Sequence, residues 1–70
     1  MELIPVSSTE VKAIGYDKVS AILFVAFHSG DTYQYFDVPE HLYSAFMGAT
    51  SKGQFLYQYI KYNYRYQKIG

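Results

Sequence analysis

The longest apolar run in the chain, Ala21–Phe27, constrains the fold more than any other feature. Its seven residues are mostly β-branched, aromatic or aliphatic, which is typical of a β-strand. The run is too short to be a transmembrane helix. Because both faces of such a strand would be apolar, the run predicts a central strand, or a strand whose outer face meets another surface.

Alternation of side chains along this strand sorts its residues into two faces. One face carries Leu23, Val25 and Phe27, and the opposite face carries Ile22, Phe24 and Ala26. An exposed apolar strip on the second face would mark an interface with a protein partner or with a second copy of the chain. The alternative is that the helices or the last strand cover it.

Two further strands are predicted beside this run, at Val11–Tyr16 and Thr32–Phe36. The residues His28–Asp31 read as a hairpin loop, in which Gly30 can supply the positive φ that such a turn needs. The three strands therefore form an antiparallel β-meander.

The first helix is predicted to follow the meander. Asp37 and Glu40 have the spacing of a helix N-cap and its N3 partner, and Pro39 fits in the first turn. Leu42, Ala45 and Phe46 share one helical stripe, with Tyr43 and Met47 beside it, and Gly48 is the expected C′ stop.

A second capping pattern, Ser51 with Gln54, predicts a helix from Lys52 to about Tyr62. Tyrosine then alternates with polar residues through 64–69, and this period of two predicts a final short strand. The expected fold is α+β with the order β-β-β-α-α-β, in one domain spanning residues 1–70.

The chemistry expected of this chain is limited. The sequence has 70 residues and no cysteine, so neither disulfides nor thiolate metal ligands are available. The two histidines, His28 and His41, lack the spacing of a metal site. Serine-nucleophile and glycine-rich nucleotide motifs are also missing. We therefore expect a non-enzymatic protein with no catalytic residues, no metal and no cofactor.

Aromatic residues make up 20% of the chain, with nine tyrosines and five phenylalanines. A domain this small needs large rings to close its core, yet nine hydroxyl groups need partners or water. Tyr33 and Tyr35 share one strand face, with about 7 Å between them. They are either core residues beneath the helices or an exposed platform on which RNA bases could stack.

The net charge is zero, but the charges are unevenly distributed. Residues 1–50 contain all six acids against two lysines, a balance of −4. Residues 51–70 contain four basic residues and no acid, a balance of +4. This segment either complements the acidic part of the same domain or forms a basic face for phosphate. Its basic residues are Lys52, Lys61, Arg65 and Lys68.

These pieces together resemble the KTSC domain, a small module named for its occurrence at the C-terminus of some lysyl-tRNA synthetases. It also occurs as a stand-alone protein of bacterial or phage origin. Each piece is short, and the resemblance rests on their order and spacing over nearly the whole chain. The pieces are Val6-Ser7-Ser8, Ile14–Asp17, Leu23-x-Val25-x-Phe27, Gly30, Tyr33-Gln34-Tyr35, Val38-Pro39 with Tyr43, Ala49, Ser51, Gly53, Phe55, Ile60-Lys61 and Tyr64.

The resemblance implies a domain of poorly defined function. RNA binding is suggested for it only because the domain occurs in the same chain as a tRNA synthetase. The family's YxY motif falls on Tyr33 and Tyr35. This chain departs from the family pattern at Tyr57, where asparagine is common, and at Phe24 and Ala26, where charged residues are frequent. The N-terminal residues lack the features of a signal peptide, so a cytoplasmic location is expected.

Two functions remain open at this stage. The first is an accessory module that binds single-stranded RNA or tRNA through Tyr33, Tyr35 and the basic C-terminal third. The second is a protein-interaction module or homodimer that uses the outer apolar strip, Ile22, Phe24 and Ala26.

Overall fold

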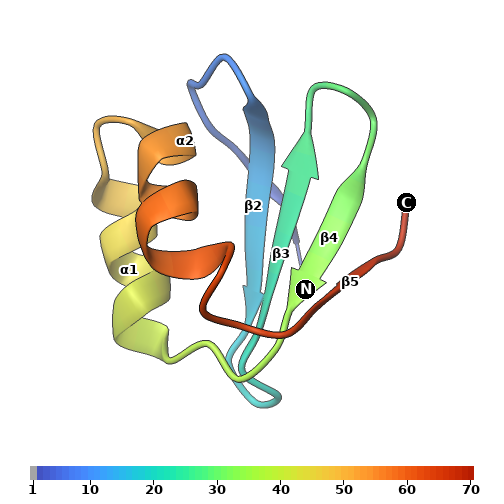
Figure 1. Ribbon diagram of the computed structural model, residues 1–70, viewed down its shortest axis with the longest axis vertical. Coiled ribbons are helices and arrows are strands. Elements are labelled where there is room, and N and C mark those ends of the chain that lie inside the picture. Colours follow the sequence, from blue (N-terminus) through green and yellow to red (C-terminus); the bar gives the residue numbers. More distant parts are fainter. Residues whose placement is uncertain (1) are drawn as a thin grey trace.

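The computed structural model describes residues 2–70 and contains one five-stranded antiparallel sheet in the order β1-β2-β3-β4-β5 (Figure 1). The strands follow one another across the sheet in chain order, with the helices inserted between β4 and β5. The elements are β1 (Ile4–Pro5), β2 (Val11–Asp17), β3 (Ile22–Phe27), β4 (Thr32–Tyr35), α1 (Glu40–Gly48), α2 (Lys52–Phe55), the π-helix η1 (Leu56–Ile60) and β5 (Tyr66–Lys68).

The predicted meander corresponds to β2, β3 and β4, with β3 in the centre. Val25 lies opposite Ile14 on one side and opposite Tyr33 on the other. The hairpin between β3 and β4 contains Gly30 at a φ of 103°, which is the conformation expected of it.

The sheet has two strands beyond the meander, one at each edge. β5 confirms the predicted final strand and pairs antiparallel with β4. β1 was not predicted, because two exposed residues give no alternating pattern. Its Pro5 is compatible with an edge strand, where a missing backbone N–H breaks no interior ladder.

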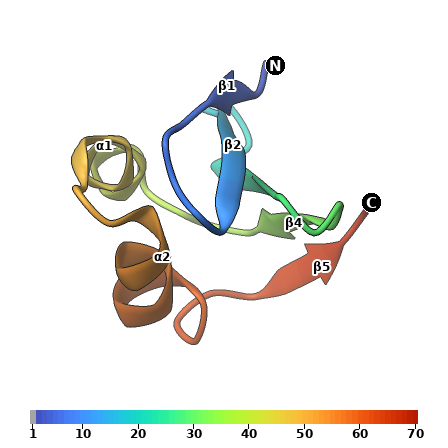
Figure 2. The ribbon, with the colours of Figure 1, turned by 90° about the horizontal axis from the view of Figure 1, so that it is seen from above.

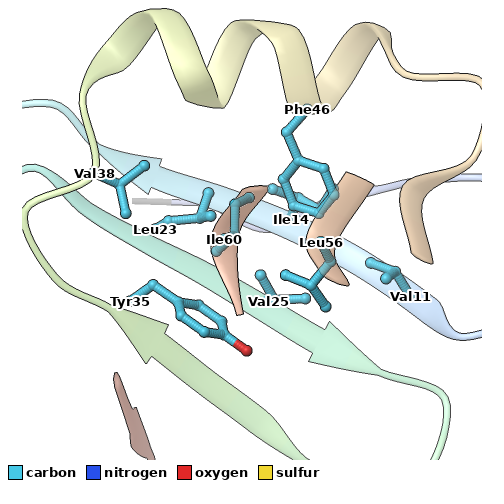
Figure 3. Packing of buried hydrophobic residues seen from close by; sticks show 9 residues of the cluster. All are labelled: Val11, Ile14, Leu23, Val25, Tyr35, Val38, Phe46, Leu56 and Ile60. Atoms are coloured by element: carbon cyan, nitrogen blue, oxygen red, sulfur yellow. The ribbon is translucent and has the colours of Figure 1, made fainter. Parts of the chain in front are cut away.

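Both helical segments pack against one face of the sheet, and among residues 2–70 no helix lies on the other face (Figure 2). Side chains from the helices meet those of the strands in a single core (Figure 3). The helices contribute Phe46, Leu56 and Ile60, and the rest of the buried cluster is Val11, Ile14, Leu23, Val25, Tyr35 and Val38.

The start of α1 differs from the sequence-based prediction. Asp37 does not cap the helix, which begins at Glu40 after Pro39. The reason lies in Val38, which is fully buried and whose backbone N–H donates to the carbonyl of Ala21. Asp37 next to this anchor has a left-handed φ of 59°, Pro39 is extended, and the helix therefore begins at Glu40.

The end of α1 also differs. Gly48 is the last helical residue rather than a left-handed stop, and Ala49 after it is extended with a φ of −69°. Ser51 caps the next helix as predicted, because its Oγ accepts a hydrogen bond from the backbone N–H of Gln54 at 3.3 Å.

The second helix changes geometry part-way along. α2 continues directly into η1, and we call residues 52–60 the second helical segment. The backbone N–H of Lys61 donates to the carbonyl of Leu56, five residues earlier, at 2.7 Å. The segment ends at Ile60, before the predicted Tyr62, and the side-chain amide of Asn63 donates to the carbonyl of Tyr59. Short π-helical turns of this kind are frequent at functional sites.

The predicted outer strip lies on the face without helices. Phe24 is half-buried and is the cross-strand partner of Gly15, which has no side chain, and of Gln34. Ile22 is half-buried and Ala26 is buried. Within residues 2–70, no helix is long and apolar enough to cross a membrane.

The left-handed conformation of Ala21 generates a stability prediction. Its φ is 58°, a region that costs an L-residue about 1–2 kcal/mol and costs glycine little. The Ala21→Gly variant should therefore raise the free energy of unfolding by up to about 1 kcal/mol, measured by urea denaturation. Ala45→Gly, at an exposed position inside α1, is the matched control and should lower it by about 1 kcal/mol. Equal losses in the two variants would contradict the assignment at Ala21.

Candidate functional site

A groove of about 460 Å³ opens between the second helical segment and the sheet. The sheet provides residues from β3, β4 and β5, and the helical side provides Leu56, Tyr57 and Lys61. Aromatic side chains make up half of the lining: Phe27, Tyr33, Tyr35, Tyr57 and Tyr66. The charged members are Glu10, Asp31 and Lys61.

The tyrosine pair predicted from the sequence points toward the helices. Tyr35 lies opposite Leu23 and Tyr33 opposite Val25, so both share the face that carries the core. Tyr35 is only 3% exposed and belongs to the core, whereas Tyr33 is half-buried at the groove wall. Of the two rings, that of Tyr35 belongs to the core and that of Tyr33 is the more accessible one at the groove.

Tyr66 of β5 completes an aromatic wall with this pair. Its ring centroid lies 5.7 Å from that of Tyr33 and 6.0 Å from that of Tyr35. Tyr66 is 58% exposed, although it is the cross-strand partner of the buried Tyr35. Its exposed ring is therefore available to a planar ligand.

Lys61 lies among aromatic rings on the helical side of the groove. Its Nζ donates a hydrogen bond to the hydroxyl of Tyr57 at 3.4 Å and lies 4.4 Å from the centroid of that ring. The ring of Tyr62 is 5.6 Å away on another side. The hydrogen bond to Tyr57 raises the pKa of Lys61 above its ordinary value.

Two of the other basic residues pair with acids of residues 1–50. Arg65 lies 3.7 Å from a carboxylate oxygen of Asp37, and its guanidinium is over the ring of Phe36 at 5.0 Å. Lys68 lies 3.3 Å from a carboxylate oxygen of Asp31. These contacts agree with the reading in which the basic segment complements the acidic part of the same domain.

Lys52 is outside the tyrosine groove. Its Nζ donates to the carbonyl of Ala49 at 2.5 Å, which ties it to the turn before α2. It lines a second groove of about 540 Å³ between residues 7–10 and residues 50–54, whose other side chains are mostly hydroxyl and amide groups.

Metal-ligating residues are not gathered in this structure. Across residues 2–70, no group of three or more His, Asp or Glu side chains could hold an ion. His28 lies on the surface with its Nε2 at 3.0 Å from the carbonyl oxygen of Ser8, and His41 is exposed in α1.

Sequence reasoning missed several groove residues. Tyr57 lies four positions before Lys61, a spacing that places two side chains side by side on a helix and could have linked them. Tyr66 was part of the predicted last strand, but its partner strand could not be named. Glu10 and Asp31 lie in loops, and no local pattern connects them to the tyrosines.

The comparison with known families identifies the fold. The KTSC domain model matches residues 7–64, and these contain most of the groove lining. The chain belongs to the KTSC domain family. A crystal structure of a KTSC domain protein from Yersinia pestis, 43% identical, superposes with a TM-score of 0.93 and covers 99% of this chain and 97% of that one.

Relatives of this KTSC domain are of two kinds. An uncharacterized protein of Stutzerimonas stutzeri is 36% identical over 70 residues, which is 99% of each chain. A lysine–tRNA ligase of a Nostoc species is 34% identical over 59 residues, which is 84% of this chain and 10% of that enzyme. The same KTSC domain is thus found in a small protein and within a much longer ligase.

The KTSC match ends before β5. Tyr33, Tyr35, Tyr57 and Lys61 therefore lie inside the matched residues, whereas Tyr66 lies outside them. One residue that lines the groove of this KTSC domain, Tyr66, is therefore not covered by the family model.

Burial of Tyr35 generates a prediction of pH dependence. Burial, followed by the neighbouring hydroxyls of Tyr33 and Tyr66, raises the pKa of Tyr35 from 10.0 to about 12. The unfolded chain therefore ionises at lower pH than the folded one. The contribution of Tyr35 to stability should be complete below pH 10 and lost as the pH rises toward 12. Tyr35→Phe should lessen the fall in the free energy of unfolding over this range, whereas Tyr62→Phe, at a position 75% exposed, should leave it unchanged. Equal behaviour of the two variants in urea denaturation would contradict the prediction.

Proposed function

We propose that this chain is a non-enzymatic binding module and that its tyrosine groove binds single-stranded RNA. The observation that carries the proposal is the Lys61 ammonium held 4.4 Å from the ring of Tyr57 at a groove lined by further tyrosines. Single strands are bound by aromatic rings that stack on bases and by cations that contact phosphates. The groove offers both kinds of group within reach of one nucleotide.

The relatives support RNA as the nucleic acid. Three lysine–tRNA ligases contain a segment similar to this chain, and each of these enzymes is named for its action on tRNA. In each case the segment is 10% of the enzyme, so the ligase activity itself is not assigned to this chain.

The charge arrangement limits the strength of this binding. Arg65 and Lys68 are already paired with Asp37 and Asp31, which leaves Lys61 as the principal cation of the groove. We therefore propose weak binding with a shallow salt dependence, in which about one phosphate is neutralised. For single strands, each neutralised phosphate contributes about −0.7 to the slope of log affinity against log salt.

The test is an amide-shift NMR titration with a short mixed-sequence single-stranded RNA at several salt concentrations. Lys61→Gln should reduce the slope by about 0.7, because it removes the phosphate contact. Tyr66→Ala should weaken binding by about 1–3 kcal/mol through lost stacking. Lys12→Gln, an exposed lysine that does not line the groove, is the matched control and should bind like the original chain. Saturable shifts that Lys61→Gln leaves unchanged would refute this proposal.

A second candidate function is self-association through the outer face of the sheet. The observation that favours it is the helix-free face on which Phe24 and Ile22 are half-exposed (Figure 2). Apolar groups of this kind often lie at interfaces between proteins.

Light scattering at high protein concentration tests this second candidate. A homodimer should have twice the mass of the 8.1 kDa chain, and Phe24→Lys should return it to the mass of one chain. Ile4→Lys, at an exposed apolar position in β1, is the control for nonspecific effects of added charge. A single-chain mass for the original protein would exclude the dimer.

A further inference from the structure

The tyrosine groove contains two carboxylates, those of Asp31 and Glu10. Asp31 directly precedes β4, and Glu10 directly precedes β2, where its carbonyl accepts a hydrogen bond from the backbone N–H of His28. This hydrogen bond joins the turn before β2 to the hairpin that contains Asp31. Both carboxylates therefore belong to segments that meet at the β3–β4 hairpin.

The lysine lies at a different turn of the second helical segment from Glu10. The Glu10 carboxylate is at the start of the second helical segment, since its Oε1 lies only 2.5 Å from the position that a Cβ would occupy at Gly53. Lys61 follows the end of the same segment. The eight steps from Gly53 to Lys61 correspond to at most about 12 Å along the helix axis. The Lys61 side chain extends back to the hydroxyl of Tyr57, which its Nζ contacts at 3.4 Å. The Glu10 carboxylate and the Lys61 ammonium group therefore lie at different turns of the second helical segment.

The carboxylate of Asp31 is both held in place and open to a ligand. One of its oxygens pairs with Lys68 Nζ at 3.3 Å, and Lys68 is the cross-strand partner of Tyr33. The ion pair therefore connects Asp31 to the residue opposite Tyr33, and 43% of the Asp31 side chain is exposed to a ligand. Its second oxygen accepts no hydrogen bond from the part of the chain that the structure describes, residues 2–70.

A nucleotide has the same order of groups as this groove. Its base carries N–H donors on one edge, and its phosphate lies beyond the sugar. A base stacked on Tyr33 or Tyr66 would present its edge to Asp31, while the phosphate would extend toward Lys61. A carboxylate accepts two parallel hydrogen bonds only from an edge with two adjacent donors.

We propose that the groove prefers guanine and that Asp31 reads the guanine edge; this inference rests on the proposed RNA-binding function. Guanine presents N1–H and N2–H side by side, so that the Asp31 carboxylate can accept one on its free oxygen and the other on the second lone pair of the oxygen that pairs with Lys68. Adenine and cytosine present one amino group beside an acceptor nitrogen, and uracil presents one N–H between two carbonyl groups. Each of these three bases would place an acceptor against the carboxylate.

The proposal is tested by NMR titration of the full chain with four single-stranded RNA pentamers, UUGUU, UUAUU, UUCUU and UUUUU. UUGUU should bind about 5- to 150-fold more tightly than UUUUU, the range expected for one good bidentate contact to a base. Asp31→Asn should reduce the ratio of the affinities for UUGUU and UUUUU to about one. The ratio is the readout, because the substitution also frees Lys68 from its partner and so raises the affinity for both RNAs through phosphate contacts. The amide spectrum of the variant without RNA checks that it is folded.

The outcomes separate this inference from the proposed function. Equal binding of all four pentamers would overturn the guanine preference and leave the RNA-binding function intact. A guanine preference lost in Glu10→Gln but kept in Asp31→Asn would overturn the role of Asp31. Absence of binding to any pentamer would overturn the RNA-binding function, and the guanine preference with it.

Discussion

The packing of one face of β3 is the interaction on which the rest of this structure depends. Leu23 and Val25 are fully buried beneath the helices, and the antiparallel register then fixes what lies beside them. Tyr35 is opposite Leu23, and Tyr33 is opposite Val25, so the position of both tyrosines is decided by the aliphatic residues of the central strand. A slip of one residue would exchange the two faces of the strand. Such a slip would bury Phe24 and expose Leu23. The burial of Leu23 and Val25 therefore fixes the register, and with it the positions of the groove tyrosines.

The aromatic residues serve the core and the groove at the same time. Tyr35 packs in the core beside β3 and also lines the groove, where its ring contacts those of Tyr33 and Tyr66. A chain of 70 residues with no cysteine has few other means of stabilising a sheet edge. A change at Tyr35 should therefore alter both the packing of the core and the shape of the groove.

Elements that depend on short stretches of sequence could be predicted from the sequence alone. The apolar run Ala21–Phe27, the Ser51 cap and the period of two after Tyr64 predicted β3, α2 and β5. Local signals failed where tertiary contacts decide the structure. Asp37 has the residue type of a cap, but burial of Val38 moves the helix start away from it. The groove could be foreseen only in part, through Tyr33, Tyr35 and Lys61. Glu10, Asp31 and Tyr66 join it through strand pairing and loop contacts, which no short stretch of sequence encodes.

The short last strand has a consequence for the energetics of the groove. β5 has three residues, all of them exposed, and it pairs only with β4 at an edge of the sheet. Such edges exchange their amide hydrogens through local opening, at a free energy below that of global unfolding. Detachment of β5 would carry away Tyr66 and the cation beside Asp31 while the core around Leu23 stays closed. Local opening of β5 would therefore open the groove while the domain stays folded, and a ligand that needs the closed groove would stabilise the closed domain against this opening as well as against global unfolding.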